Sequence, residues 1–178
     1  MEKENLNELI KKSGLRVCET IALEGLGLFT APASKGHHLA YRGGLIMHSA
    51  NVANMLALQT RMLEIKWSRP ESPYIVGLLH DLVKCRCYVE KEDGGYEYRQ
   101  PAYPGHGVCS VAIAAELGIR LREDEIAAIT YHMGLYGAGK EYTAEEFNNA
   151  LKLYAPQIIA TCCADWYSAR VTEEGSCE

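Results

Sequence analysis

Histidine and aspartate occur together in stretches of this chain that are otherwise apolar. His80 and Asp81 follow the run Gly-Leu-Leu at residues 77–79, in one of the most apolar parts of the sequence. His48 stands at the start of another long amphipathic stretch, after residues 43–47. An ionised carboxylate is costly to bury unless it is paired or binds a metal ion. The simplest explanation for a His-Asp pair in such a run is therefore a metal site.

Three further residues of the same kinds fall on predicted helices. His106 begins one helix, His132 lies near the end of the next, and Asp165 lies on the apolar stripe of the last. Taken singly, each histidine is more simply a hydrogen-bonded core residue, and Asp165 a cap or salt-bridge partner. As a set they favour one pocket, because imidazole and carboxylate together suit manganese, iron, cobalt, nickel or zinc. The candidate ligands are His48, His80, Asp81, His106, His132 and Asp165.

The elements that must position these residues follow from hydrophobic periodicity and from capping and breaking residues. The predicted helices cover residues 5–12, 16–24, 47–67, 73–84, 106–117, 123–134, 143–153 and 156–170. Ser72 and Pro73 open the fourth helix, which is apolar almost all round and should lie centrally. Thr143 and Glu146 have capping-box spacing. Asp93-Gly94-Gly95 predicts a hairpin turn within residues 88–99.

Length and composition indicate an ordinary soluble domain. The chain has 178 residues, 48% of them hydrophobic and 23% charged. Its net charge of -5 argues against a general nucleic-acid surface. Seven cysteines without a paired spacing, and no signal-peptide or membrane-span pattern, predict reduced thiols in a cytoplasmic protein. We expect a mainly all-α single domain, with a core at about residues 31–170, an N-terminal helical extension at 1–28 and a frayed tail at 171–178.

The order His, His-Asp, His, His, Asp resembles the HD superfamily of metal-dependent phosphohydrolases over roughly residues 31–170. The minimal signature of that family, His…His-Asp…Asp, matches His48, His80-Asp81 and Asp165. His106 and His132 resemble the additional histidines of its two-metal branch. Residues 31–48, APASKGHHLAYRGGLIMH, are most similar to the HD domain of YhaM-type 3′→5′ exoribonucleases. Those enzymes also carry an OB-type nucleic-acid-binding domain, for which this chain has no room, so no long nucleic acid is expected as a partner.

The resemblance implies an HD-domain helical bundle with two divalent transition-metal ions. His48, His80, Asp81 and Asp165 would hold one ion. Asp81 would bridge to a second ion, held also by His106 and His132. A water activated between two such ions can attack phosphorus, with Asp81 and Lys84 as catalytic residues. The groups that would hold the phosphoryl oxygens are Lys84, His37, His38 and Arg42. For Lys84 a purely structural role, as a cation at a helix C-terminus, is equally compatible with the sequence.

The expected activity is hydrolysis of a phosphate ester of a nucleotide or short oligonucleotide, most simply a phosphodiester. Three alternatives remain open from the sequence: a phosphomonoesterase acting on nucleoside monophosphates, a di-iron oxygenase on the same ligand set, and a non-catalytic nucleotide-binding regulator. Phosphate release distinguishes the hydrolases from the regulator, and oxygen consumption with bound iron identifies the oxygenase.

Overall fold

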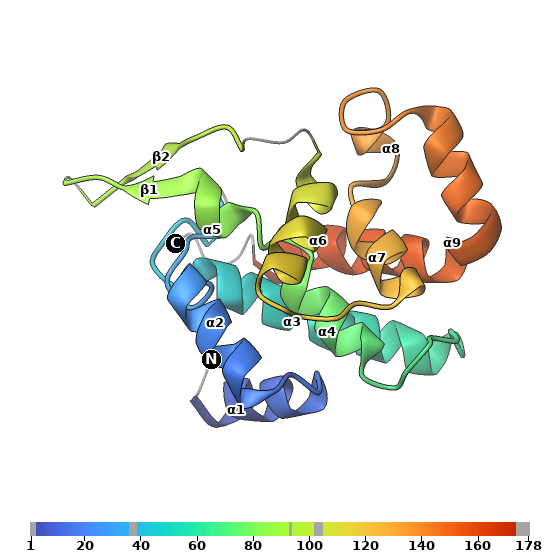
Figure 1. Ribbon diagram of the computed structural model, residues 1–178, viewed down its shortest axis with the longest axis horizontal. Coiled ribbons are helices and arrows are strands. Elements are labelled where there is room, and N and C mark those ends of the chain that lie inside the picture. The colour runs from blue at the N-terminus through green and yellow to red at the C-terminus, as the bar shows by residue number, and fades with distance from the viewer. Residues whose placement is uncertain (1–2, 36–38, 93, 102–104, 174–178) are drawn as a thin grey trace.

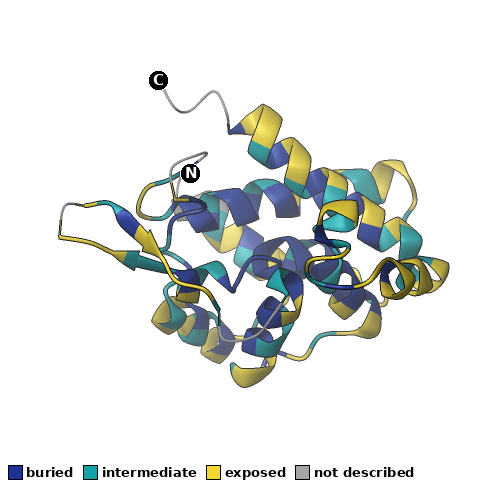
Figure 2. Ribbon diagram, turned by 90° about the horizontal axis from the view of Figure 1, so that it is seen from above, coloured by how far each residue is buried: buried dark blue, intermediate teal, exposed yellow. Residues whose placement is uncertain are grey.

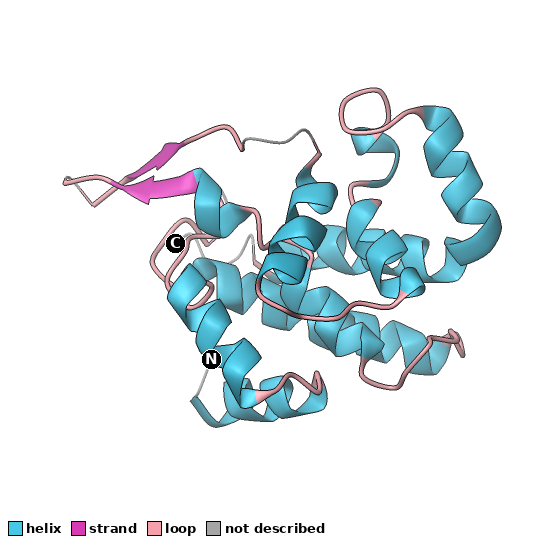
Figure 3. Ribbon diagram, in the orientation of Figure 1, coloured by secondary structure: helices cyan, strands magenta, loops and turns pink. Residues whose placement is uncertain are grey.

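The computed structural model describes residues 3–35, 39–92, 94–101 and 105–173. Within these residues the chain is mainly helical with a two-stranded antiparallel hairpin, as the sequence predicts (Figures 1 and 3). The elements are α1 (Lys3–Lys12), α2 (Val17–Leu26), α3 (Gly44–Met62), α4 (Ser72–Leu79), α5 (Lys84–Cys87), β1 (Tyr88–Glu90), β2 (Tyr96–Tyr98), α6 (His106–Glu116), α7 (Glu123–Thr130), α8 (Gly134–Gly137), α9 (Ala144–Tyr167) and the π-helical turn η1 (Ser168–Thr172).

Helices α3 and α4 form the centre of the fold. Ile75, Val76, Leu78 and Leu79 of α4 are at most 2% exposed, which confirms the central position expected from the apolar sequence of this helix. A Cβ atom at Gly77 would lie 2.3 Å from the Cα atom of Ala53 on α3. The two helices can therefore approach this closely only because residue 77 has no side chain. Figure 2 shows the buried segments in the interior and exposed residues on the outer helix faces.

Helix α4 ends earlier than the sequence predicts. The pattern indicates one helix to Lys84, but α4 ends at Leu79, residues 80–83 form turns, and α5 begins at Lys84. The ring Nδ1 of His80 lies 2.9 Å from the carbonyl oxygen of Gly77. In a continuing α-helix, that oxygen would accept a hydrogen bond from the main-chain N–H of Asp81. The bond from the Lys84 N–H to the Asp81 carbonyl, 2.9 Å, spans three residues rather than four. The break therefore falls at the His-Asp pair.

Two other helices also differ from prediction at their ends. The long helix expected over 47–67 begins at Gly44 and ends at Met62. Glu64 has a φ of 52°, a left-handed conformation that a helix cannot continue through. The helix expected to reach residue 134 ends at Thr130, so His132 lies in the turn that follows it.

The last two predicted helices are joined into one. Helix α9 runs from Ala144 to Tyr167 with non-helical angles at Tyr154, φ -132° and ψ 27°, and Figure 1 shows it bending there around one end of the molecule. Pro156 cannot donate the hydrogen bond that a straight helix needs and restricts the residue before it. The predicted cap is present: Thr143 Oγ1 accepts from the N–H of Glu146 at 3.1 Å.

The predicted hairpin is confirmed by pairing of Tyr88 with Tyr98 and of Glu90 with Tyr96. Asp93, in its predicted turn, lies outside the described residues. In the described part of the chain, no helix combines the length and apolar character needed to cross a lipid bilayer.

Candidate metal centre

The six residues singled out by type and spacing come together in one cluster. They lie in the second turn of α3, in the turns after α4 and α7, at the first residue of α6 and near the end of α9. His48, His80 and His132 are at most 1% exposed, while the side chains of His106 and Asp165 are 22% and 16% exposed. The cluster is therefore buried, with its accessible side at His106 and Asp165.

Asp81 lies at the middle of this cluster. Each of its carboxylate oxygens faces several nitrogen atoms. Oδ1 is 2.6 Å from His106 Nε2 and 3.6 Å from His132 Nε2. Oδ2 is 2.6 Å from Lys84 Nζ, 3.3 Å from His80 Nε2 and 3.6 Å from His48 Nε2. A carboxylate whose two oxygens face separate groups of nitrogen atoms has the arrangement needed to bridge two cations.

Close backbone contacts bring the histidines of different helices together. A Cβ atom at Gly107 would lie 2.3 Å from the carbonyl oxygen of Ile129, so the glycine lets the start of α6 rest against the end of α7. The rings of His106 and His132 then have centroids 5.7 Å apart. His80 lies between His132 and His48, at centroid distances of 5.0 and 5.2 Å.

Hydrogen bonds to main-chain carbonyl oxygens select one tautomer of two of these histidines. His80 Nδ1 faces Gly77 O at 2.9 Å, and His132 Nδ1 faces Ile129 O at 2.7 Å. Because a carbonyl oxygen can only accept, each Nδ1 carries a proton, and in the neutral ring the lone pair is then on Nε2. Nε2 of His80 is buried and, among the described residues, has no hydrogen-bond partner. A buried lone pair of this kind fits a metal ion, since ligating histidines are held in this way.

Two overlapping groups of ligand atoms lie within 4.8 Å of one another. One consists of His48, His80 and Asp165, and the other of His80, Asp81 and His132. His106 joins the second group through its 2.6 Å contact with Asp81. The donor set is nitrogen and carboxylate oxygen throughout, which matches the divalent metals named from the sequence.

His48 is oriented by a residue that the sequence did not point to. Its Nδ1 lies 3.1 Å from both carboxylate oxygens of Glu173, which follows η1 and is 2% exposed. Asn51 Nδ2 donates to the same carboxylate at 2.9 Å. Residue 173 thus differs from the frayed tail expected from residue 171 onward, because these contacts fix it. No pattern in the sequence relates position 173 to position 48.

The pKa values reflect a buried group of opposite charges. Burial alone would lower the pKa of His48, but hydrogen bonds to Asp165 and Glu173 outweigh it and raise the pKa to about 9. Burial would raise the pKa of Asp81, yet the charges of Lys84 and the neighbouring histidines hold it well below its usual range. Burial lowers the pKa of His80. Asp81 therefore stays ionised in the interior, where it attracts cations.

Of the cations predicted to hold phosphate, Lys84 lies at the cluster. The two loop cations that the structure describes, Lys35 and Arg42, do not contact it. The Lys84 side chain is 15% exposed and its ammonium contacts Asp81. Lys35 is exposed, and Arg42 Nη1 lies 3.3 Å from Glu90 Oε2 of the hairpin, with both side chains mostly exposed. His37 and His38, predicted to hold phosphate, lie outside the described residues.

Replacing Glu173 by Gln is expected to weaken metal binding by about 10–100-fold, the range typical of partners that orient a ligating histidine. Glutamine keeps an acceptor for Asn51 and for His48 Nδ1 but removes the charge that supports His48. Equilibrium dialysis against manganese measures the effect, with the exposed Glu24→Gln on α2 as the matched control. Equal metal affinity of the Glu173→Gln and wild-type proteins would show that this carboxylate serves only the fold.

Two sequence comparisons relate this chain to known proteins. A family model described as the HD domain matches residues 45–167. A protein of Methanocaldococcus jannaschii named dihydroneopterin 2′,3′-cyclic phosphate phosphodiesterase is 35% identical over 77 residues, which is 42% of this chain and 31% of that protein. The chain thus aligns with less than a third of that relative. No solved structure matches.

Proposed function

The chain belongs to the HD-domain family, and on this premise we propose that it is a metal-dependent phosphohydrolase that cleaves a small phosphodiester of a nucleotide or short oligonucleotide. The observation that carries the proposal is Asp81, buried and ionised, with its two oxygens turned toward separate sets of imidazole nitrogens. A small substrate is favoured because the relative's name describes a small cyclic phosphodiester and because the net charge is -5.

We assign the ligands as the family resemblance implies. His48, His80, Asp81 and Asp165 would hold one divalent ion, and Asp81, His106 and His132 a second. The ions, when bound, would supply Lewis acidity toward a phosphoryl oxygen and would lower the pKa of a water. The two most accessible members of the cluster, His106 and Asp165, mark the side from which a phosphate would approach.

The protein's own side chains supply charge and orientation. Glu173 and the carbonyl oxygens of Gly77 and Ile129 keep the histidine Nδ1 atoms protonated, so that every Nε2 faces the cluster. Lys84 adds a fixed positive charge beside Asp81. Burial would lower its pKa, but the attraction of Asp81 raises it, so the ammonium stays charged at neutral pH. A charged donor at this position stabilises negative charge that develops on phosphoryl oxygens.

The proposal is tested with the purified, manganese-loaded protein. We expect up to two metal ions per chain by elemental analysis, and chelator-sensitive hydrolysis of bis(p-nitrophenyl) phosphate and of 2′,3′-cyclic nucleotides. Long structured RNA should be a poorer substrate. Phosphate release from nucleoside monophosphates alone would point to a phosphomonoesterase instead. Failure to hydrolyse any phosphate ester with any of the five metals would refute the proposal, and oxygen consumption with bound iron would indicate an oxygenase.

Lys84→Ala should lower kcat by about 100-fold, the effect of removing one preorganised donor to a developing anion. Metal content should remain unchanged, because the ammonium faces the carboxylate and cannot itself bind a cation. The readouts are kcat on the cyclic nucleotide and metal content by elemental mass spectrometry. Lys152→Ala, on the exposed face of α9, is the control. Unchanged turnover, or loss of metal from Lys84→Ala, would assign Lys84 a structural role.

A further inference from the structure

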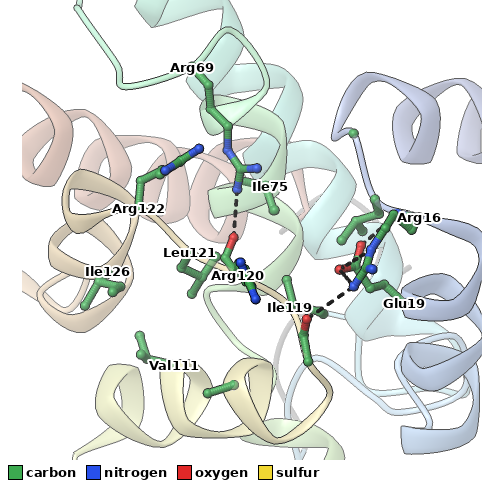
Figure 4. A pocket seen from close by; sticks show the side chains of 14 residues that line it. Arg16, Glu19, Arg69, Ile75, Val111, Ile119, Arg120, Leu121, Arg122 and Ile126 are labelled. Carbon is green, nitrogen blue, oxygen red and sulfur yellow. Dashed lines mark hydrogen bonds and ion pairs between the residues drawn. The ribbon is translucent and has the colours of Figure 1, made fainter.

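A cavity of about 970 Å³ lies apart from the metal centre, and none of the six cluster residues lines it. Its walls come from the α1–α2 connection, α2, the segment before α4, α4 itself, α6, the α6–α7 connection and α7 (Figure 4). Apolar side chains form much of the lining: Leu15, Ile75, Val111, Ile119, Leu121 and Ile126. The volume is at the upper end of the range usual for small-molecule sites, about 300–1,000 Å³.

Two of the four arginines in the lining are already engaged. Arg16 forms a two-bond contact with Glu19, at 2.9 and 2.7 Å. Arg69 does the same with Glu125, at 2.7 and 2.8 Å, and Glu125 is fully buried. Arg69 also donates to the carbonyl oxygen of Arg120 at 3.2 Å. These contacts neutralise both guanidinium groups and hold the α6–α7 connection in place.

The other two arginines carry uncompensated charge. Arg120 and Arg122 are exposed, and neither side chain makes a hydrogen bond or ion pair with any described residue. Figure 4 shows them with Arg69 on one side of the cavity, while Arg16 and Glu19 lie on the other. Since the two engaged arginines are neutralised, the cavity keeps two positive charges in a chain whose net charge is -5. Such a local field concentrates anions.

We propose that this cavity binds a small organic anion with an aromatic or aliphatic body, of the size of a nucleoside monophosphate. Guanidinium groups bind phosphate or carboxylate through paired, charge-assisted hydrogen bonds. Arg120 and Arg122 would take the anionic group. The apolar side chains would take the body of the ligand, which inorganic phosphate lacks.

The site is independent of hydrolysis but shares helices with the metal centre. Ile75 lies on α4, which leads to His80. Val111 lies on α6, which begins with His106, and Ile126 lies on α7, which precedes His132. A bound anion would thus contact all three helices, and it should raise the melting temperature of the metal-loaded protein.

The test uses 1-naphthylmethylphosphonate, whose carbon–phosphorus bond is not a substrate for ester hydrolysis, and the full metal-loaded chain. We expect saturable binding by naphthalene fluorescence, and binding at least about 10-fold weaker for methylphosphonate, which has no apolar body. Arg120→Gln with Arg122→Gln should weaken naphthylmethylphosphonate binding by about 30-fold or more. Arg61→Gln with Arg99→Gln changes the net charge equally at exposed positions outside the cavity and should leave binding unchanged.

Two further variants locate the bound molecule. Ala115→Trp keeps every charge but places an indole ring at an exposed lining position of the cavity, and it should also weaken binding. Lys84→Ala alters the metal centre and should leave binding intact. The proposal is overturned if the probe does not bind at millimolar concentration, if methylphosphonate binds as tightly, if the Arg120/Arg122 pair or Ala115→Trp binds normally, or if Lys84→Ala loses binding.

Discussion

Asp81→Asn is expected to remove most of the bound metal and to lower phosphodiester hydrolysis by at least about 1,000-fold, well above the 10–100-fold typical of residues that only orient a ligand. Both carboxylate oxygens of Asp81 face donors, so the change affects both sides of the cluster at once. Asparagine keeps the shape but removes the charge that favours a bridge between two cations, and it turns an N–H₂ group toward one of them. His106→Ala should lose mainly one ion, because His106 contacts only one of those oxygens.

The measurement is metal stoichiometry by elemental mass spectrometry, with circular dichroism to check folding. Both variants should remain helical, since the surrounding helices bury their apolar stripes without the metal. If Asp81 were only a structural salt-bridge partner, asparagine would weaken folding and leave metal binding little changed. A full metal complement in Asp81→Asn would therefore exclude the bridged two-metal site.

Gly77→Ala should destabilise the fold by about 3 kcal/mol, at the upper end for overpacked sites, and should lower the melting temperature by roughly 6–12 °C for a chain of this size. The added Cβ atom would lie 2.3 Å from Ala53 Cα and 2.5 Å from Ala53 N. These are main-chain atoms of α3, which cannot rotate away. Helices α3 and α4 would have to separate, and with them His48 and His80, so metal affinity should also fall.

Gly25→Ala is the matched control for this prediction. Gly25 is exposed on α2, and a Cβ atom there would meet no atom within 4 Å. The same substitution should raise stability by about 0.5–1 kcal/mol, because alanine suits a helix better than glycine. The melting temperatures of both variants and of the wild type, measured by thermal denaturation, test this prediction. Equal melting temperatures for Gly77→Ala and the wild type would mean that the α3–α4 contact is not as tight as described.

The sequence was sufficient to predict the six clustered residues as a set, because their residue types share a ligand chemistry and their order resembles the signature of a known family. His80 and Asp81 show this most clearly, since nothing but a partner or a metal explains them in the run at residues 77–79. The mainly helical fold and the hairpin also follow from local periodicity and turn residues. Periodicity and turn residues involve positions only a few residues apart in the chain, and a local sequence pattern can therefore reveal them.

Features that depend on contacts across the fold could not be predicted in this way. The end of α4 is set by the His80 side chain competing for a helix carbonyl oxygen, while the helical periodicity continues to Lys84. Glu173 acquires its role only when the chain returns to α3. The charge of the cavity depends on which of its arginines form ion pairs with a glutamate. The partner of Arg69, Glu125, lies 56 residues away in the chain.

The contact between Glu173 and His48 also bears on when the protein can take up metal during its synthesis. These residues are 125 positions apart, and Asp165 is nearly as late in the chain. A ribosome that has completed the turn after α7 has made all four histidine ligands, but neither Asp165 nor Glu173, the late carboxylates that contact His48. The proposed site around His48 is therefore expected to form only after residue 173 has been translated, so metal should bind the folded domain rather than the nascent chain.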